Sequence, residues 1–292
     1  MAFSCLNSEA LKTGRDIIYN TMIKATDKPW NSPTTLYIAR RLASLSKGRS
    51  LSVLDMGCGD GTVLEYLVDY AYDLYGYDLP KNEMALKNRL SPYFGESFKA
   101  HIRMAKDDRS IPFEDHTFDV IYANQVFEHI RFLDRMLQEC TRVLKPGGVL
   151  LTIFPMATCP IEQHIGIPFA HWLPPGHFRV RYLRLFYALG LRPKSKNSTS
   201  LETAIQQDLY LRHQTFYRFM NEILSLFEYH FESYQCETNL LIQAKLDLMK
   251  MNQTTLNRFL KHIITLFPKH VLMNAITHFM DAAFCVSSPK FY

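Results

Sequence analysis

The strongest constraint on the fold is a glycine-rich turn that follows a short apolar segment. Residues 51–54 are mostly apolar, and Gly57, Gly59 and Gly61 then occupy three alternate positions. Glycine lets a backbone turn sharply and lets a ligand approach it without a Cβ atom in the way. Residues 62–72 have the pattern of a helix. The order strand, turn, helix therefore predicts a ligand-binding turn at the carboxyl end of a buried strand.

The spacing and charge of this turn indicate which class of nucleotide it binds. A dinucleotide fingerprint would need glycine at the position that Thr62 occupies in this chain. The carboxylates of Asp55 and Asp60 suit a cationic amino group and a sulfonium better than a pyrophosphate. We therefore expect a zwitterionic nucleoside without phosphate rather than a nicotinamide dinucleotide.

Helix and strand patterns alternate along the first half of the chain. Apolar residues recur at helical spacing over 34–45, after the start signal Asn31-Ser32-Pro33. Beyond the turn, the pattern predicts strands at 72–77, 98–104, 118–122 and 149–154 and helices at 81–90 and 131–144. We expect an α/β fold with a Rossmann-like, doubly wound, mostly parallel sheet and helices on both faces.

Residues 53–61 match the first motif of a known family. The segment has the form apolar-apolar-Asp-x-Gly-x-Gly-x-Gly, and it resembles that of the class I S-adenosylmethionine-dependent methyltransferases. Residues 122–129 and 144–150 are similar to later segments of that family, so the resemblance covers about residues 34–155. It implies S-adenosylmethionine as the cofactor and methyl transfer as the reaction.

The resemblance also implies roles for individual residues. Asp78 stands where the family has an acidic residue that ends the second strand and holds both ribose hydroxyls. Asp107, with Asp108 beside it, stands where an acidic residue contacts the adenine amino group, and either carboxylate can make this contact. The expected cofactor-binding residues are Asp55, Gly57, Cys58, Gly59, Asp60, Gly61, Asp78, Leu79, Asp107, Asp108 and Asn124.

One residue is a candidate for acid–base catalysis. The cofactor supplies the reactive group for methyl transfer, so no catalytic triad is expected. A hydroxyl acceptor would benefit from a base with a near-neutral pKa, and His129 follows a strand at the ligand-binding edge of the sheet. The alternative is a helix-start histidine bonded to backbone. His164, His171 and His177 lack the tight spacing of metal ligands, so we predict no metal site.

The pattern changes after Pro155, where a segment rich in Pro, Gly and His begins. We predict a cofactor-binding core with an N-terminal helix at 1–155 and an α-rich insertion that covers the substrate at 156–230. Residues 231–292 should supply closing strands and C-terminal helices. Within these regions we expect helices at 178–189 and 201–227, two strands at 231–245 and two helices at 254–286.

Charge and aromatic content bear on the acceptor. Asp and Glu are absent from residues 163–201, a stretch rich in Arg and Lys, and the net charge of the chain is +5. Such a segment can face an anionic acceptor, or it can be a solvated helix face. The interleaved aromatic residues favour a small-molecule or lipid/glycan-precursor acceptor. An RNA methyltransferase and a noncatalytic binding protein are the alternatives.

Location and assembly follow from the remaining features. Residues 1–19 mix polar and apolar side chains, unlike a secretory signal, and no apolar run reaches the about 18–20 residues of a membrane-spanning helix. The six cysteines are scattered, as expected for free thiols in a reducing compartment. We expect a cytoplasmic protein with no integral membrane segment. The chain can also form a homodimer. The apolar tail from Thr254 can pack on the core, on a second subunit or on a membrane surface.

Overall fold

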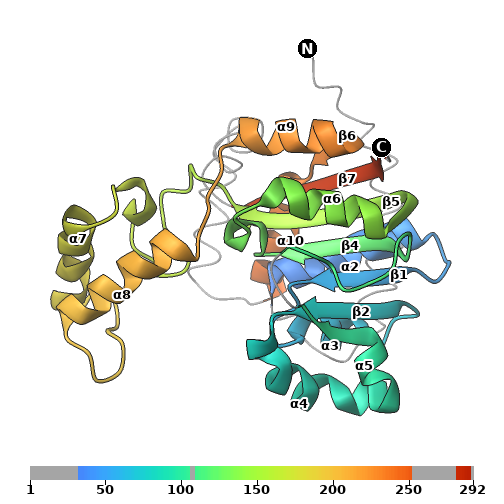
Figure 1. Ribbon diagram of the computed structural model, residues 1–292, viewed down its shortest axis with the longest axis horizontal. Coiled ribbons are helices and arrows are strands. Elements are labelled where there is room, and N and C mark those ends of the chain that lie inside the picture. Colours follow the sequence, from blue (N-terminus) through green and yellow to red (C-terminus); the bar gives the residue numbers. More distant parts are fainter. Residues whose placement is uncertain (1–31, 106–108, 252–280, 291–292) are drawn as a thin grey trace.

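The computed structural model describes residues 32–105, 109–251 and 281–290. Its centre is a seven-stranded sheet of order β3-β2-β1-β4-β5-β7-β6 (Figure 1). Strands β1 to β5 pair in parallel, whereas β7 runs antiparallel between β5 and β6. The strands are β1 Ser52–Met56, β2 Asp73–Asp78, β3 Ile102–Met104, β4 Phe118–Asn124, β5 Leu144–Pro155, β6 Phe231–Cys236 and β7 Asp281–Pro289.

Helices lie on both sides of this sheet, and two more helices form a pair beside it (Figure 1). The α-helices are α2 Pro33–Ser46, α3 Thr62–Leu67, α4 Glu83–Phe94, α5 Phe98–His101, α6 Leu133–Val143, α7 His177–Ala188, α8 Ser200–His213, α9 Met220–His230 and α10 Thr238–Met251. The prediction of a Rossmann-like, doubly wound, mostly parallel sheet is confirmed. Among the described residues, no helix has both the length and the apolar character to cross a membrane.

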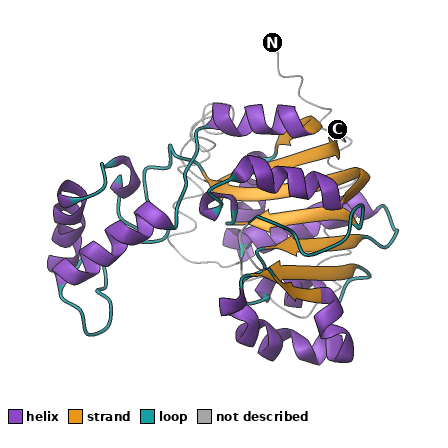
Figure 2. Cartoon of the chain, in the orientation of Figure 1, coloured by secondary structure: helices purple, strands orange, loops and turns teal. Residues whose placement is uncertain are grey.

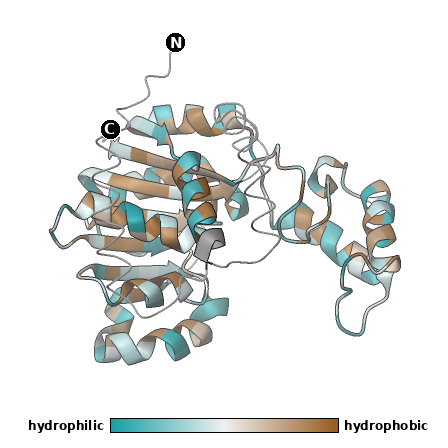
Figure 3. Cartoon of the chain, turned by 180° about the vertical axis from the view of Figure 1, so that it is seen from behind, coloured by the Kyte–Doolittle hydropathy of each residue, from teal (hydrophilic) through white to brown (hydrophobic). Residues whose placement is uncertain are grey.

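Each face of the sheet buries its own apolar cluster. On one face, Leu137 of α6 and Phe227 of α9 belong to the same cluster as Ile121 of β4. On the other face, Leu42 of α2 and Val53 of β1 belong to a second cluster, which also includes side chains of α3, α4 and α10. The central strands are therefore buried on both sides, as parallel sheets require, and Figure 3 shows the hydrophobic colour concentrated in them.

Helix α2 begins where the sequence signal places it. The Ser32 side chain caps the helix by accepting a hydrogen bond from the Thr34 amide at 3.3 Å, and Pro33 occupies the first turn. Further along α2, the Tyr37 hydroxyl donates to Glu237 at 2.7 Å, and Arg41 pairs with the same carboxylate at 2.8 Å. These contacts hold α2 against the segment that leads into α10.

Helices α7 and α8 pack on one another at one side of the sheet, and loops join them to it (Figure 2). Their small core includes Ile167, Leu183 and Leu211. A buried ion pair joins the two helices, because Arg179 Nε lies 2.6 Å from an Asp208 carboxylate oxygen. This α-rich unit falls within the predicted insertion, 156–230.

Several predicted elements differ from the structure. Residues 98–101 form helix α5, so the strand expected over 98–104 is confined to its last residues. The helix expected over 62–72 ends at Leu67. The single helix expected over 201–227 is divided into α8 and α9, because the Phe216 amide donates to the Glu128 carbonyl and not to a helical acceptor.

The C-terminal region holds the other differences. Only one strand, β6, lies within 231–245, because α10 begins at Thr238 and buries apolar residues at helical spacing. Residues 281–286, expected as helix, lie in β7, where Ala282 to Val286 are all buried. A strand buried on both faces shows no alternation, so periodicity alone does not separate it from a buried helix. Residues 254–280 of the expected tail helices lie outside the described residues.

Candidate functional site

The glycine-rich turn between β1 and α3 adopts a left-handed backbone at each of its glycines. The φ angles of Gly57, Gly59 and Gly61 are +70°, +58° and +82°, which L side chains rarely adopt. The amides of Gly57 and Cys58 donate to the Tyr77 carbonyl at 3.0 and 3.1 Å. The turn is therefore fixed against the end of β2.

The three glycines have different surroundings. A Cβ atom at Gly57 would lie 2.7 Å from Val126 Cγ2, and one at Gly61 would lie 2.8 Å from Leu90 Cδ1. A Cβ atom at Gly59 would meet nothing within 4 Å. Packing thus requires glycine at positions 57 and 61, whereas Gly59 borders open space through which a ligand can approach the backbone.

Asp78 joins this turn to the end of β2. One of its carboxylate oxygens accepts the Gly59 amide at 2.6 Å, and the other accepts the Leu79 amide at 2.6 Å. A carboxylate has about four lone-pair sites, so both oxygens keep capacity for further donors. The predicted ribose residue and the glycine turn are therefore in direct contact, with acceptor capacity left for two hydroxyls.

The other two carboxylates of the motif have different environments. Asp55 is buried beneath the turn, and this burial raises the pKa of its carboxyl to about 8, with the charge of Asp78 acting in the same direction. The Asp60 carboxylate accepts from the Thr62 amide at 3.1 Å and pairs with Arg89 at 2.8 Å. The Asp60 carboxylate is therefore bound to Thr62 and Arg89 at the start of α3.

Asn124 ends β4 beside the start of α2. Its amide nitrogen donates to the Thr34 hydroxyl at 3.3 Å, and that hydroxyl lies 2.8 Å from Ser32 Oγ. The Asn124 side-chain oxygen is buried and has no hydrogen-bond partner among the described residues. Thr34 is a neighbour of the site that the sequence did not indicate. Asp107 and Asp108, expected at the adenine, lie outside the described residues.

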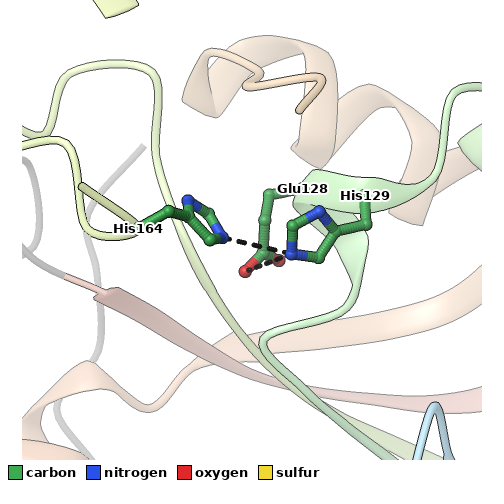
Figure 4. Close-up of side chains that lie close together, drawn as sticks. All are labelled: Glu128, His129 and His164. Carbon is green, nitrogen blue, oxygen red and sulfur yellow. Dashed lines mark hydrogen bonds and ion pairs between the residues drawn. The ribbon is translucent and has the colours of Figure 1, made fainter. Parts of the chain in front are cut away.

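A second polar cluster, consisting of Glu128, His129 and His164, lies at the same edge of the sheet (Figure 4). Glu128 and His129 belong to the short 3-10 helix η3, Phe127–His129, which follows β4. His129 Nε2 lies 3.1 Å from His164 Nε2 and 4.0 Å from a Glu128 carboxylate oxygen. The predicted catalytic candidate therefore faces a second histidine and a buried carboxyl.

The other ring nitrogen of each histidine is also engaged. His129 Nδ1 lies 2.6 Å from the Gln214 carbonyl oxygen, and His164 Nδ1 lies 2.7 Å from a Glu162 carboxylate oxygen. Burial lowers the pKa of His129, and the proximity of His164 acts in the same direction. Of the three histidines weighed as metal ligands from the sequence, only His164 enters this cluster. His171 instead bonds to the Ala157 carbonyl at 3.1 Å.

A pocket of about 630 Å³ lies beside the cluster. Its walls include His171, Trp172, Phe216 and Tyr217. The Tyr217 hydroxyl also bonds to Glu162 and lies 3.0 Å from His164 Nδ1. One side chain therefore belongs both to the pocket wall and to the hydrogen-bond network around His164.

Known proteins are similar to the region that holds the glycine turn, Asp78 and η3. Residues 54–152 match a family model described as a methyltransferase domain. A sterol 4-C-methyltransferase of Caenorhabditis elegans is 38% identical over 104 residues, which are 36% of this chain and 31% of that protein. Residues 54–152 are a class I S-adenosylmethionine-dependent methyltransferase domain. The predicted family and cofactor, S-adenosylmethionine, are confirmed.

Further similarities are limited to part of the relatives' length. The human mitochondrial ubiquinone biosynthesis O-methyltransferase is 30% identical over 122 residues, 41% of this chain and 32% of that protein. The chain thus matches about a third of the length of these curated relatives. A solved phosphoethanolamine N-methyltransferase of Haemonchus contortus has a TM-score of 0.45 and 16% identity, covering 94% of this chain and 56% of that chain.

Residues outside the methyltransferase motifs complete the site. Glu162, Gln214 and Tyr217 hold the two histidines, although they come from loop segments that carry no motif. Glu162 is fully buried, and a buried acidic residue is rare without a partner. The nearest sequence signal is the Pro-, Gly- and His-rich composition after Pro155, which marks the segment as unusual but identifies no side chain.

Proposed function

We propose that this protein transfers a methyl group from S-adenosylmethionine to a small-molecule or lipid/glycan-precursor acceptor. The observation that carries the proposal is the contact between Asp78 and Gly59, with open space at Gly59 and free acceptor capacity on the carboxylate. A nucleoside lying along the turn would bring its ribose hydroxyls to Asp78. Methyl transfer needs little more than two reactants held in line.

The remaining predicted cofactor contacts are part of this proposal. The backbone from Gly57 to Gly61 would face the amino-acid part of the cofactor, and Leu79 would border the ribose. Asp107 or Asp108 would accept a hydrogen bond from the adenine amino group. The buried, unpartnered side-chain oxygen of Asn124 supports a contact with a ligand donor at the end of β4.

The pocket supports a small or lipid-like acceptor. Its volume of about 630 Å³ lies within the range of about 300–1,000 Å³ that is typical of ligand pockets. The described residues that line it all fall within 157–219, which supports residues 156–230 as the substrate cover. The curated relatives named for sterol and ubiquinone precursor methylation also favour an apolar acceptor. His129 is the proposed base if the acceptor is a hydroxyl.

RNA is the less favoured acceptor. The basic stretch expected to face an anion is partly engaged within the protein, because Arg179 is buried against Asp208 and Arg192 bonds to the Gly166 carbonyl. Arg181 and Arg184 remain exposed. An assay that identifies the acceptor must therefore also be able to detect methylated RNA.

Replacing Asp78 tests the cofactor site. Asp78→Ala should weaken S-adenosylhomocysteine binding by about tenfold or more in calorimetry, since hydrogen bonds to a charged group are worth about 1.5–3 kcal/mol. The matched control is Asp73→Ala, which removes a carboxylate from the opposite end of the same strand, β2. Equal affinity in the two variants, with both folded by circular dichroism, would mean that another residue holds the ribose.

A labelled-methyl assay tests the acceptor. Protein, labelled cofactor and a cell extract are incubated together, and the extract is then separated into lipid, polar-metabolite and RNA fractions. Label in the lipid or metabolite fraction supports the proposal, whereas label confined to RNA would establish the alternative. Tight S-adenosylhomocysteine binding without any labelled product would indicate a noncatalytic binding protein.

A further inference from the structure

We propose that Glu128, His129 and His164 bind a divalent transition-metal ion (Figure 4). One ligand atom from each residue lies within 4.8 Å of the other two. The two imidazole nitrogens are 3.1 Å apart. Two nitrogen ligands at about 2.0–2.1 Å from zinc lie roughly 2.8–3.4 Å apart when they subtend 90–109° at the ion. The histidine pair therefore already has the separation of two ligands on one metal.

The hydrogen-bond partners fix which nitrogen of each ring carries a hydrogen. His129 Nδ1 faces the Gln214 carbonyl oxygen, which can only accept, so Nδ1 must donate. His164 Nδ1 faces Glu162, whose carboxylate also accepts from the Ile165 amide at 2.7 Å and from the Tyr217 hydroxyl. In the neutral rings, both Nε2 atoms then carry lone pairs that point toward one another. A cation between them resolves this repulsion.

Glu128 supplies a second, independent indication of a ligand. Its side chain is fully buried, and neither carboxylate oxygen has a hydrogen-bond partner among the described residues. Figure 4 shows this carboxylate directed toward the two imidazoles. An unpartnered buried carboxyl is costly and rare in native structures. A metal ion would satisfy the carboxylate and both histidines at once.

The surroundings are those of a metal site. Histidine ligands usually donate their second N–H group to a carboxylate or a backbone carbonyl, which fixes the ring and its tautomer. Here Glu162 does this for His164, and the Gln214 carbonyl does it for His129. The His129 side chain is 37% exposed, so an ion can reach the cluster from solvent.

The ligand set narrows the class of ion. Imidazole suits zinc, copper, iron and nickel, whereas magnesium and calcium prefer oxygen ligands throughout. Two histidines and one carboxylate therefore favour a first-row transition metal, with positions left open for water or another oxygen ligand. The competing explanation is a proton shared between His129 and His164, which would need no metal, and only then is His129 Nε2 available as the base proposed above.

Cobalt binding distinguishes these explanations. The full chain, stripped of metal by a chelator and freed of any affinity tag, is titrated with Co²⁺ while its visible absorption is recorded. We expect one Co²⁺ per chain with ligand-field bands that Zn²⁺ abolishes by competition. Absence of any bands in the folded parent protein would overturn the proposal in favour of the shared proton.

Variants test the assignment to these residues. His164→Ala should abolish the cobalt bands, whereas His171→Ala, which removes a nearby histidine outside the cluster, should retain them. Glu162→Gln should weaken Co²⁺ affinity by about 10–100-fold while keeping the bands, as expected for a residue that orients a ligand. Bands of equal strength and affinity in His164→Ala would overturn the assignment.

The metal proposal can fail separately from the proposed function. Binding of S-adenosylhomocysteine is measured by calorimetry on the same metal-free and cobalt-loaded samples. Cofactor binding without cobalt binding would refute only the metal site, and the reverse would refute only the cofactor site. If His164→Ala does not fold, Glu128→Gln replaces it, with weakened cobalt affinity as the expected result and unchanged affinity as the contrary one.

Discussion

Replacing Gly59 should distinguish an effect on ligand binding from an effect on folding stability. Its φ angle is +58° and a Cβ atom there would have no neighbour within 4 Å. Gly59→Ala should therefore lower the free energy of unfolding only by the left-handed backbone penalty, about 1–2 kcal/mol. The new methyl group would stand in the open space beside the turn, where we propose that the cofactor binds. We expect S-adenosylhomocysteine affinity to fall by about tenfold or more, which corresponds to roughly 1.4 kcal/mol.

Substitutions at two other glycines serve as comparisons for Gly59→Ala. Gly147 also has a positive φ, +75°, and a Cβ atom there would likewise meet open space, but it lies near the opposite end of the sheet, at the start of β5. Gly147→Ala should show the same loss of stability with no loss of affinity. At Gly57, the contact of 2.7 Å with Val126 adds overpacking to the backbone strain, so Gly57→Ala should lose about 2–5 kcal/mol.

Urea unfolding and calorimetry with S-adenosylhomocysteine measure these two quantities in the parent protein and the three variants. Gly59→Val and Cys58→Ala extend the series, and the branched side chain should do more damage than removal of the thiol. The reasoning would be refuted if Gly59→Ala bound S-adenosylhomocysteine as tightly as Gly147→Ala does. It would also be refuted if Gly57→Ala were no less stable than Gly59→Ala.

Two further predictions concern buried charges. Burial raises the pKa of Glu128 to about 8, above the about 4.3 of an unfolded chain, so the folded state binds more protons between these values. The stability of the metal-free protein should fall as pH rises through this window, by up to a few kcal/mol. In Glu128→Gln, the free energy of unfolding measured in urea should depend less on pH between 5 and 8. The dependence that remains would come from Asp55, whose pKa burial also raises to about 8. Arg179→Met removes the closest charged partner of the buried Asp208 and leaves it the Gly176 amide at 3.2 Å and Arg212 at 3.7 Å. Hydrogen exchange in α7 and α8 should therefore accelerate while exchange in β4 is unchanged.

The fold of residues 34–155 could be predicted because its signals are local. The strand, the glycine turn and the helix start lie within one short stretch, and each apolar run has the length and period of a single element. Within this region the predicted bounds at 62–72 and 98–104 were wrong, whereas the larger errors lie where a segment depends on distant partners. Strand β7 is buried between β5 and β6, so its sequence shows neither alternation nor a turn that would mark it as a strand.

The histidine cluster could not be predicted for a related reason. His129 and His164 are 35 residues apart in the chain, and no short motif joins them. The segment that positions them includes the break between α8 and α9, where Gln214 and Tyr217 turn toward η3. Sequence periodicity predicted a continuous helix there, which would have placed both residues on a helix surface. Instead, the hydrogen bond from the Phe216 amide to the Glu128 carbonyl interrupts the helix there.

One short segment, residues 125–129, joins the glycine turn to the histidine cluster. Val126 packs against Gly57, and a Cβ atom on Gly57 would lie 2.7 Å from it. Glu128 and His129 follow within three residues, in η3. The preceding residue, Gln125, has a φ of +60°, and its amide donates to the Ile153 carbonyl at 2.7 Å, which fixes the start of this segment on β5. Because parallel strands β1 and β4 are neighbours, their carboxyl ends share one edge of the sheet. The glycine turn and the histidine cluster are therefore both held by the same five residues, 125–129, through Val126 at Gly57 and through Glu128 and His129 in the cluster.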